Sequence, residues 1–412
     1  MNARTLLLLA GSLACAISLY AEDWPQFLGP TRNGVYAGTN LADKWPDEGP
    51  KVLWRKPVGE GFSGPVVAAG KLILFSRDKD EESVQAFDPA TGKVLWRTAY
   101  STTYVDSFGF DPGPRATPCV EGGNVYTLGA DGILQCLALQ DGKVMWRVDT
   151  RKVYQARKGF FGMASSPLVE GQAVLVNIGG TAGAGIIALD KANGKLLWKA
   201  SDEEASYSSP VTATIDGTRQ ALFLTRHSLV GLDPVSGRQL FTHPFGPSER
   251  SSVTAASPVV AGDLIFLSGC YGAGASVVQL KAGAPKVLWS DPDVLSNHYA
   301  TSVHHRGFLY GVNGRTDPGM PPASLCCVDM KTGKLRWQDE TIGPATVTLA
   351  GETLVILTEK GELLRAPATP EGFRPGSRAQ ILSVQVRAYP AIADSHLFAR
   401  SKNELVGVNL AP

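Results

Sequence analysis

The stretch "AFDPATGKVLW", residues 86–96, contains a turn between two strand-like segments. Its apolar start is followed by Asp88 and Pro89, which favour turn geometry, and by Gly92, which accepts the positive φ that such turns often need. The segment after the turn is rich in residues typical of strands and ends at Trp96. Taken alone, the stretch predicts a β-hairpin.

Versions of this hairpin recur along the chain. They are "ALQDGKVMW" ending at Trp146, "ALDKANGKLLW" ending at Trp198, "GLDPVSGRQLF" ending at Phe241, "CVDMKTGKLRW" ending at Trp337 and a shortened form, "APKVLW", ending at Trp289. Counted from Trp54, the terminal aromatic residues are spaced by roughly 40 to 50 residues, which is the period of a β-propeller blade.

Each unit also opens with small residues, a proline or its equivalent, and an apolar strand, as in "SGPVVAAGKLILFS" at residues 63–76. Eight such openings are visible, and the order of strands and turns in each unit predicts a four-stranded antiparallel blade. A single sheet of this kind would expose two apolar faces, so the blades must stack around an axis to bury them. We therefore predict an all-β, eight-bladed β-propeller. Seven blades are the alternative, because the seventh unit lacks its tryptophan.

The repeated tryptophans are predicted to hold neighbouring blades together, because an indole that docks on the turn of the next blade buries a large apolar surface. The residues with this docking role are Trp54, Trp96, Trp146, Trp198, Trp289 and Trp337. The last unit ends after three strands in "NELVGVNLAP", whereas "PKVLWRKP" at residues 50–57 is an outer strand with no blade before it. We expect these two ends to complete one blade together, which removes an open sheet edge.

The overall charge is balanced, with 39 Lys and Arg against 38 Asp and Glu, which suggests neither a nucleic-acid partner nor an anionic membrane surface. The N-terminus has a basic residue, a short apolar run and Ala21, which is the layout of a secretory signal. We expect a signal peptide at 1–21, an N-terminal lead segment at 22–49, and a propeller at 50–412. The mature chain is then an exported, periplasmic or extracellular monomer without a transmembrane segment. There are two alternatives for the N-terminus: the apolar segment is retained as a membrane anchor, or Cys15 is lipidated.

The pattern D-x-x-T-G-K-x-x-W, together with the Ser-Pro opening, resembles the pyrroloquinoline quinone (PQQ) repeat. Bacterial quinoprotein dehydrogenases and the non-enzymatic BamB type of outer-membrane assembly protein share this repeat. The resemblance covers about residues 50–410 and implies an exported propeller. It does not by itself distinguish an enzyme from a binding protein.

For a quinoprotein dehydrogenase, the resemblance implies a quinone and a calcium ion in the central funnel, a stacking tryptophan and a vicinal disulfide. Cys326 and Cys327 are adjacent, but their context "LCCVDMKTGK" places Cys327 in the small-residue position that Ala86, Ala138 and Ala188 fill elsewhere. This position favours buried thiols on a strand. No tryptophan is an obvious stacking partner. We therefore predict no cofactor, and expect PQQ and calcium only if the chain is an enzyme.

Residues that lead into each innermost strand should line the axial mouth of the propeller. The candidate ligand-binding residues there are Arg115, Tyr207, Asn297, His298, Tyr299 and Arg387. They predict a polar and aromatic mouth that suits an anionic or sugar-like ligand or a peptide, although propeller channels are also commonly lined by polar residues that bind water. His304 and His305 are consecutive and would point to opposite faces of a strand, so no metal site is predicted.

These observations favour an exported, non-catalytic propeller that binds or scaffolds a protein, a peptide or an envelope polymer. The alternative is a PQQ-dependent alcohol dehydrogenase, or a divergent propeller enzyme that uses the central funnel. A soluble protein that binds a sugar or a small anion is a third hypothesis. The serines beside the strand-opening prolines have no nucleophile-elbow context, so no catalytic residue is predicted.

Overall fold

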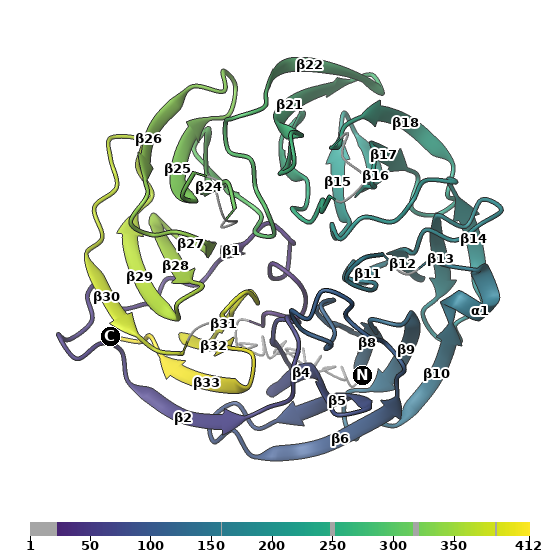
Figure 1. Ribbon diagram of the computed structural model, residues 1–412, viewed down its shortest axis with the longest axis horizontal. Helices are drawn as coiled ribbons and strands as arrows, with labels where there is room; N and C mark the ends of the chain where they lie inside the picture. Colours follow the sequence, from purple (N-terminus) through teal and green to yellow (C-terminus); the bar gives the residue numbers. More distant parts are fainter. Residues whose placement is uncertain (1–22, 158, 248–251, 316–320, 384) are drawn as a thin grey trace, which may run out of the picture.

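The computed structural model describes residues 23–157, 159–247, 252–315, 321–383 and 385–412, which form eight β-sheets in a ring (Figure 1). This confirms the eight-bladed β-propeller and rules out seven blades. The segment expected to be a signal peptide, residues 1–21, lies outside the described residues.

Blades 1 to 6 each consist of four consecutive strands that run as an antiparallel meander from the axis outward (Figure 1). The strands of blades 1 and 2 are β3 (Val66–Ala68), β4 (Lys71–Asp78), β5 (Glu81–Phe87), β6 (Val94–Ser101), β7 (Cys119–Glu121), β8 (Asn124–Leu128), β9 (Ile133–Ala138) and β10 (Val144–Asp149). Those of blades 3 and 4 are β11 (Leu168–Glu170), β12 (Ala173–Asn177), β13 (Ile186–Asp190), β14 (Leu196–Ala200), β15 (Val211–Ile215), β16 (Thr218–Leu224), β17 (Ser228–Leu232) and β18 (Gln239–Pro244). Those of blades 5 and 6 are β19 (Val259–Ala261), β20 (Leu264–Gly269), β21 (Gly274–Lys281), β22 (Ala284–Asp291), β23 (Val303–His305), β24 (Phe308–Asn313), β25 (Ser324–Asp329) and β26 (Leu335–Asp339).

Blades 7 and 8 both include strands from the N-terminal part of the chain. Blade 7 consists of β27 (Ala345–Ala350), β28 (Thr353–Thr358), β29 (Glu362–Pro367) and β30 (Ser377–Gln380), with β1 (Val35–Tyr36) added parallel to β27. Blade 8 consists of β31 (Ala391–Ala393), β32 (His396–Arg400) and β33 (Glu404–Asn409), with β2 (Val52–Pro57) as its outer strand. Trp54 lies opposite Gly407 and Lys56 opposite Leu405, so the two chain ends close the ring as expected. A short helix, α1 (Thr150–Tyr154), follows blade 2.

The repeated turn is organised by its aspartate. In blade 1, the Asp88 carboxylate accepts hydrogen bonds from the Thr91 amide at 2.8 Å and the Thr91 hydroxyl at 2.9 Å. These hydrogen bonds lower the pKa of Asp88, the hydroxyl contributing most. Gly92 then takes a φ of +65° and donates its amide to the Asp88 carbonyl. The side chains of the turn therefore set its shape before any contact with another blade.

A β-bulge follows each turn and orients the docking aromatic residue. In blade 1, Val94 pairs with Phe87 and Trp96 pairs with Ala86, which leaves Leu95 without a partner. The bulge bends the outer strand, and such irregularities discourage pairing with another sheet edge. The same shift occurs next to the docking aromatics of blades 2 to 6 and 8.

The indole of every docking tryptophan reaches the following blade. Each Nε1 donates a hydrogen bond to a main-chain carbonyl there: Trp54 to Pro89 (2.9 Å), Trp96 to Leu139 (3.0 Å), Trp146 to Lys191 (2.9 Å), Trp198 to Pro234 (3.2 Å), Trp289 to Met330 (2.8 Å) and Trp337 to Thr369 (2.8 Å). Phe241 takes the equivalent place in blade 4 and packs in the cluster shared with blade 5. The predicted docking contacts are confirmed.

Within its own blade, the residue paired with the docking aromatic is usually small. These partners are Ala86, Cys136, Ala188, Gly231, Val277, Cys327 and Gly407. The assignment of Ala138 to this position was therefore wrong: the turn of blade 2 is two residues shorter, so Cys136 takes the position (Ala138 to Trp146 against Ala86 to Trp96). Cys327 lies in the predicted small-residue position.

The turn glycines make room for the rings, which gives a direct test of docking. A Cβ on Gly142 would lie 2.5 Å from the Trp96 ring, whereas one on Gly70 would meet nothing within 4 Å. The two residues have nearly the same φ, +73° and +72°. We expect Gly142→Ala to lower the free energy of unfolding by about 1–3 kcal/mol more than Gly70→Ala, in urea titrations followed by circular dichroism. Equal losses would show that ring docking is not tight.

A buried carboxyl group also connects blades 1 and 2. Glu82 accepts hydrogen bonds from the Tyr100 hydroxyl and, at 2.9 Å, from the Ala130 amide of blade 2. Burial is the largest influence on this group and raises the pKa of Glu82 above its ordinary value of 4.5. The folded protein therefore holds this proton more tightly than the unfolded chain does.

The raised pKa predicts the sign of a pH effect. The contribution of Glu82 to stability is complete below its ordinary pKa of 4.5 and declines as the pH rises through the raised pKa of the folded state. Glu82→Gln keeps an acceptor for Ala130 and a polar partner for Tyr100 but does not titrate. We expect the stability of the wild type relative to Glu82→Gln to fall with rising pH, measured by chemical unfolding at matched pH values. A difference that does not change with pH would contradict this assignment.

Candidate functional site

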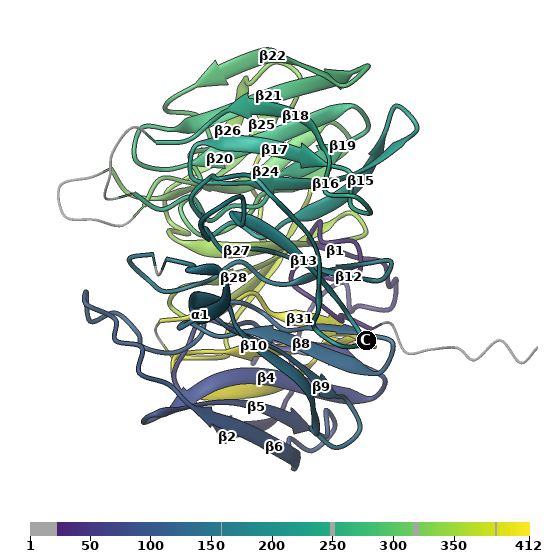
Figure 2. The ribbon, with the colours of Figure 1, turned by 90° about the vertical axis from the view of Figure 1, so that its right-hand side faces the viewer.

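The first part of the N-terminal lead segment, residues 23–36, contacts blades 1, 2, 3 and 7 and so crosses one end of the central channel. Trp24 pairs with Val67 of blade 1 through two main-chain hydrogen bonds of 2.9 Å, and β1 lies beside β27 on blade 7. In the side view, the part of the segment that carries β1 lies towards one face of the ring, and α1 lies towards the other (Figure 2). The sequence does not predict this packing of the lead against the blades, because the lead carries no copy of the repeat.

Arg32 fastens the lead segment to blade 3. Its guanidinium donates to the carbonyl oxygens of Pro167 at 2.8 Å and Ser166 at 3.1 Å, and the residue is only 4% exposed. Burial lowers the pKa of Arg32 to about 10, so the side chain remains charged at neutral pH. A buried cation held by main-chain oxygens fixes both the position and the orientation of the segment that carries it.

Removal of this guanidinium should loosen the lead segment. Arg32→Ala leaves two buried carbonyl groups without donors, which we expect to cost about 2 kcal/mol. The amides of Val67 and Val120 donate to the carbonyl oxygens of Trp24 and Pro25, so their hydrogen exchange should become faster. Arg55→Ala, which removes an exposed ion pair with Glu404, is the matched control and should leave this exchange unchanged. Unchanged exchange in Arg32→Ala would contradict the fastening role.

A cavity of about 410 Å³ occupies the axis where the chain leads into the inner strands. Five of the candidate residues line it: Arg115, Tyr207, His298, Tyr299 and Arg387. Asn297 lies outside the lining. Its amide donates to the Val312 carbonyl at 2.8 Å and its side-chain oxygen accepts from Ser302, so Asn297 holds the structure behind the cavity. Phe27 of the lead segment also lines the cavity.

Bulky and small residues both occupy the positions just before the inner strands. Blades 1, 2, 4, 6 and 8 place Phe62, Arg115, Tyr207, Tyr299 and Arg387 there. Blades 3, 5 and 7 place Ala164, Ala255 and Gly343. The small residues leave room between the bulky ones, so the bulky side chains form a wall and do not fill the axis.

Arginine and aromatic side chains alternate along this wall. The guanidinium carbon of Arg115 lies 5.3 Å from the Phe161 ring centre and 5.6 Å from that of Phe62. Arg387 lies 5.5 Å from Phe62 and 5.7 Å from Tyr299. Such cation–π contacts hold the guanidinium planes against the rings while leaving N–H groups for other acceptors.

The charges of the wall are partly compensated. Arg115 forms an ion pair of 3.3 Å with Asp106, and Arg387 Nε donates to Glu359 at 2.6 Å. Tyr299 Oη is buried and has no hydrogen-bond partner among the described residues. Burial is the main cause that raises the pKa of Tyr299, with the Glu359 carboxylate acting in the same direction, so Tyr299 stays a neutral hydroxyl donor.

Two loops around the mouth carry phenylalanines that are not among the residues predicted from the sequence. Phe108 and Phe110 lie on the loop between blades 1 and 2, and Phe160 and Phe161 precede blade 3. Phe108 and Phe110 are 54% and 50% exposed. Ring contacts of 5.3 to 5.9 Å join the four phenylalanines into one cluster that reaches Tyr207. The signal was present in "SFGFDPG" and "GFFG", because phenylalanines between loop glycines have no strand to bury them.

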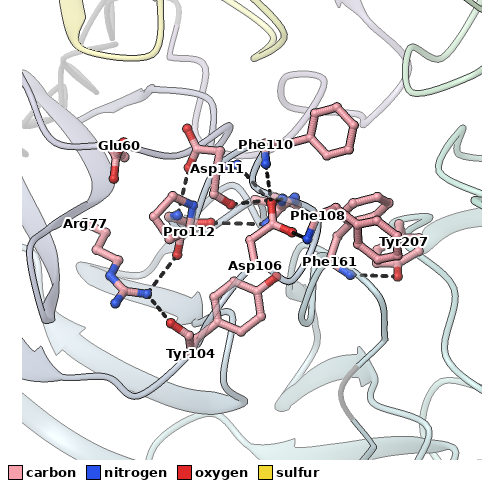
Figure 3. Close-up of polar contacts among 12 residues, drawn as sticks. Glu60, Arg77, Tyr104, Asp106, Phe108, Phe110, Asp111, Pro112, Phe161 and Tyr207 are labelled. Atoms are coloured by element: carbon pink, nitrogen blue, oxygen red, sulfur yellow. Dashed lines mark hydrogen bonds and ion pairs between the residues drawn. The ribbon is translucent and has the colours of Figure 1, made fainter. Parts of the chain in front are cut away.

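The loop with Phe108 and Phe110 is held by a buried carboxylate (Figure 3). Asp106 accepts hydrogen bonds from the amides of Phe108 at 3.0 Å, Phe110 at 3.1 Å and Asp111 at 2.9 Å. From the blade side, Arg77 donates to the carbonyl oxygens of Tyr104 and Pro112. The main chain that carries the exposed rings of Phe108 and Phe110 is therefore fixed by several hydrogen bonds (Figure 3).

The family model described as "Outer membrane protein assembly factor BamB" matches residues 37–106 and 80–339. This chain belongs to that family. The BamB of Burkholderia pseudomallei (strain K96243) is 25% identical over 372 residues, which cover 78% of this chain and 87% of that protein. The BamB of Yersinia pestis is 24% identical over 257 residues, 60% of this chain and 58% of that protein.

Solved structures show the same fold in BamB proteins and in quinoproteins. BamB from Moraxella catarrhalis aligns with a TM-score of 0.63 and 14% identity, covering 87% of this chain and 97% of that one. Quinohemoprotein alcohol dehydrogenase from Comamonas testosteroni aligns with a TM-score of 0.68 and 15% identity, covering 94% of this chain and 80% of that one. Identities this low establish the shared propeller and nothing about activity.

The cavity does not offer the groups expected around a quinone and a calcium ion. No tryptophan lines it, and nowhere in the described ranges do three or more His, Cys, Asp or Glu side chains gather as metal ligands. Cys326 and Cys327 are buried, free thiols on β25, and neither lines the cavity. His304 accepts from the Gly307 amide and His305 contacts Glu352. In the part of the chain described, no helix is long and apolar enough to cross a membrane.

Proposed function

We propose that this BamB-family chain is an exported protein of the bacterial envelope that binds other proteins and catalyses no reaction. The observation that carries the proposal is the exposed phenylalanine cluster at the axial mouth. Contiguous apolar groups on the surface of a soluble protein mark interaction sites. Membership of a family named for outer membrane protein assembly is consistent with a protein partner in the envelope.

The polar groups around the cavity support binding more than catalysis. Asp106 is committed to three amides and to Arg115, and Glu359 to Arg387. Carboxylates committed in this way position loops and cations and are poor general bases. We propose that the cavity needs no quinone, calcium or other cofactor.

Site-specific photo-crosslinking in cells tests the proposal. We expect p-benzoylphenylalanine in place of Phe108 to form a discrete adduct with a protein of the envelope fraction. The same substitution at Val235, which is 86% exposed on the turn between β17 and β18, should not form that adduct. Identical adducts at both positions, or none at Phe108, would count against a partner at the mouth.

The dehydrogenase alternative has its own measurement. Purified protein mixed with PQQ and calcium should show no shift of the thermal unfolding midpoint and no dye-linked oxidation of alcohols. A stabilising shift that a chelator reverses would overturn the non-catalytic proposal, because a ligand that binds only the folded state must raise its stability.

A further inference from the structure

The cavity lining combines four phenylalanines from the loops around the mouth with cationic side chains along the wall. We use "aromatic rim" for Phe108, Phe110, Phe160 and Phe161. Among the charged side chains that line the cavity itself, three are cationic and one is anionic; they are Arg115, Arg315, Arg387 and Glu359. The rim and the wall are continuous, because Arg115 lies against Phe161 and Arg387 lies 5.9 Å from the centre of Phe110.

The aromatic rim is arranged for binding before any partner arrives. The Asp106 carboxylate fixes the amides of Phe108 and Phe110, and the side chain of Asp106 is only 2% exposed. Exposed rings on a rigid loop lose little conformational entropy when they are covered, which is a property of residues that dominate binding energy at interfaces.

In the described structure, the wall of the cavity contains hydrogen-bond donors without acceptors. Arg387 makes one hydrogen bond within the described ranges, from Nε to Glu359, and its side chain is 32% exposed. Its remaining N–H groups are thus available to a ligand. The buried Tyr299 Oη also has no partner in the described structure, and its ring lies against the Arg387 guanidinium. A carboxylate can accept from an arginine fork and a hydroxyl at the same time.

We infer that the mouth binds an extended segment of a partner protein in which an Asp or Glu stands next to aromatic residues. This inference rests on the proposed protein-binding function and names the chemistry of the partner. The aromatic residues would pack on the aromatic rim, and the acidic side chain would reach Arg387. Because the lead segment crosses the other end of the channel, the partner segment enters and leaves on the rim side and does not thread through the ring.

Fluorescence anisotropy with defined peptides tests the inference. The probe is a fluorescein-labelled Gly-Ser peptide with a central Phe-Asp-Phe and an amidated C-terminus. We expect it to bind the full mature protein at least about tenfold more tightly than matched peptides with Phe-Lys-Phe or Ala-Asp-Ala at the centre. Equal binding of the Asp and Lys peptides, or no binding at all, would overturn the inference. So would binding that requires a free C-terminal carboxylate.

Substitutions in the protein locate the binding site. Phe108→Ser and Phe110→Ser change exposed rings, and Arg387→Gln keeps a polar side chain without the charge. Each should weaken binding of the Phe-Asp-Phe peptide by about tenfold or more. Arg387→Gln should also reduce the preference for this peptide over one with Phe-Asn-Phe, which mere loss of packing would not do.

Two exposed residues on the turns of other blades supply controls. Val235→Ser and Arg374→Gln are matched in chemistry and should bind the peptide as the wild type does. If the controls weaken binding as much as the mouth variants, the site is elsewhere. Crosslinking to an envelope protein without any peptide binding would leave the scaffold proposal standing and remove this inference. Peptide binding without an envelope adduct would support the recognition of an acidic, aromatic segment and count against a partner in the envelope.

Discussion

The contact between an indole ring and the glycine turn of the next blade is the interaction on which this propeller depends. Each blade has two apolar faces, so it is stable only when a neighbour covers each face. The β-bulge before the ring aims it sideways, the turn glycine leaves space for it, and a main-chain carbonyl accepts the indole N–H. The pairing of β2 with β33 closes the circle of blades. No blade can therefore move away from one neighbour without disturbing its contact with the other.

A closed ring of blades leaves a channel along its axis, and the N-terminal lead segment crosses one end of that channel. Arg32 is central to this arrangement, because a buried guanidinium bonded to two carbonyl oxygens of blade 3 cannot move without losing both bonds. Phe27 of the same segment contributes to the lining. The lead therefore packs against the blades and contributes to the lining of the axial cavity.

The repeat and the proposed binding surface use aromatic residues in opposite ways. The docking tryptophans stand on strands, are largely covered by the next blade and stabilise the ring. Phe108 and Phe110 stand on a loop, remain half exposed and contact the phenylalanines of the loop before blade 3. The protein maintains this exposed loop with a buried ion pair and three amide hydrogen bonds to Asp106. These interactions hold an apolar surface in an exposed position, which is the main physical reason to propose a partner at the mouth.

The sequence by itself determined the blade number, the docking role of the tryptophans and the closure of the ring, because these features follow from a local hairpin pattern that is repeated. It also identified Arg115, Tyr207, His298, Tyr299 and Arg387 as neighbours, since equivalent positions in a ring must converge at the axis. Only the tertiary structure decided that Asn297 supports the cavity from behind, that Cys136 and not Ala138 pairs with Trp146, and that the lead segment crosses one end of the channel. These features arise from contacts between residues distant in sequence and from turns of unequal length, and no repeat pattern encodes them.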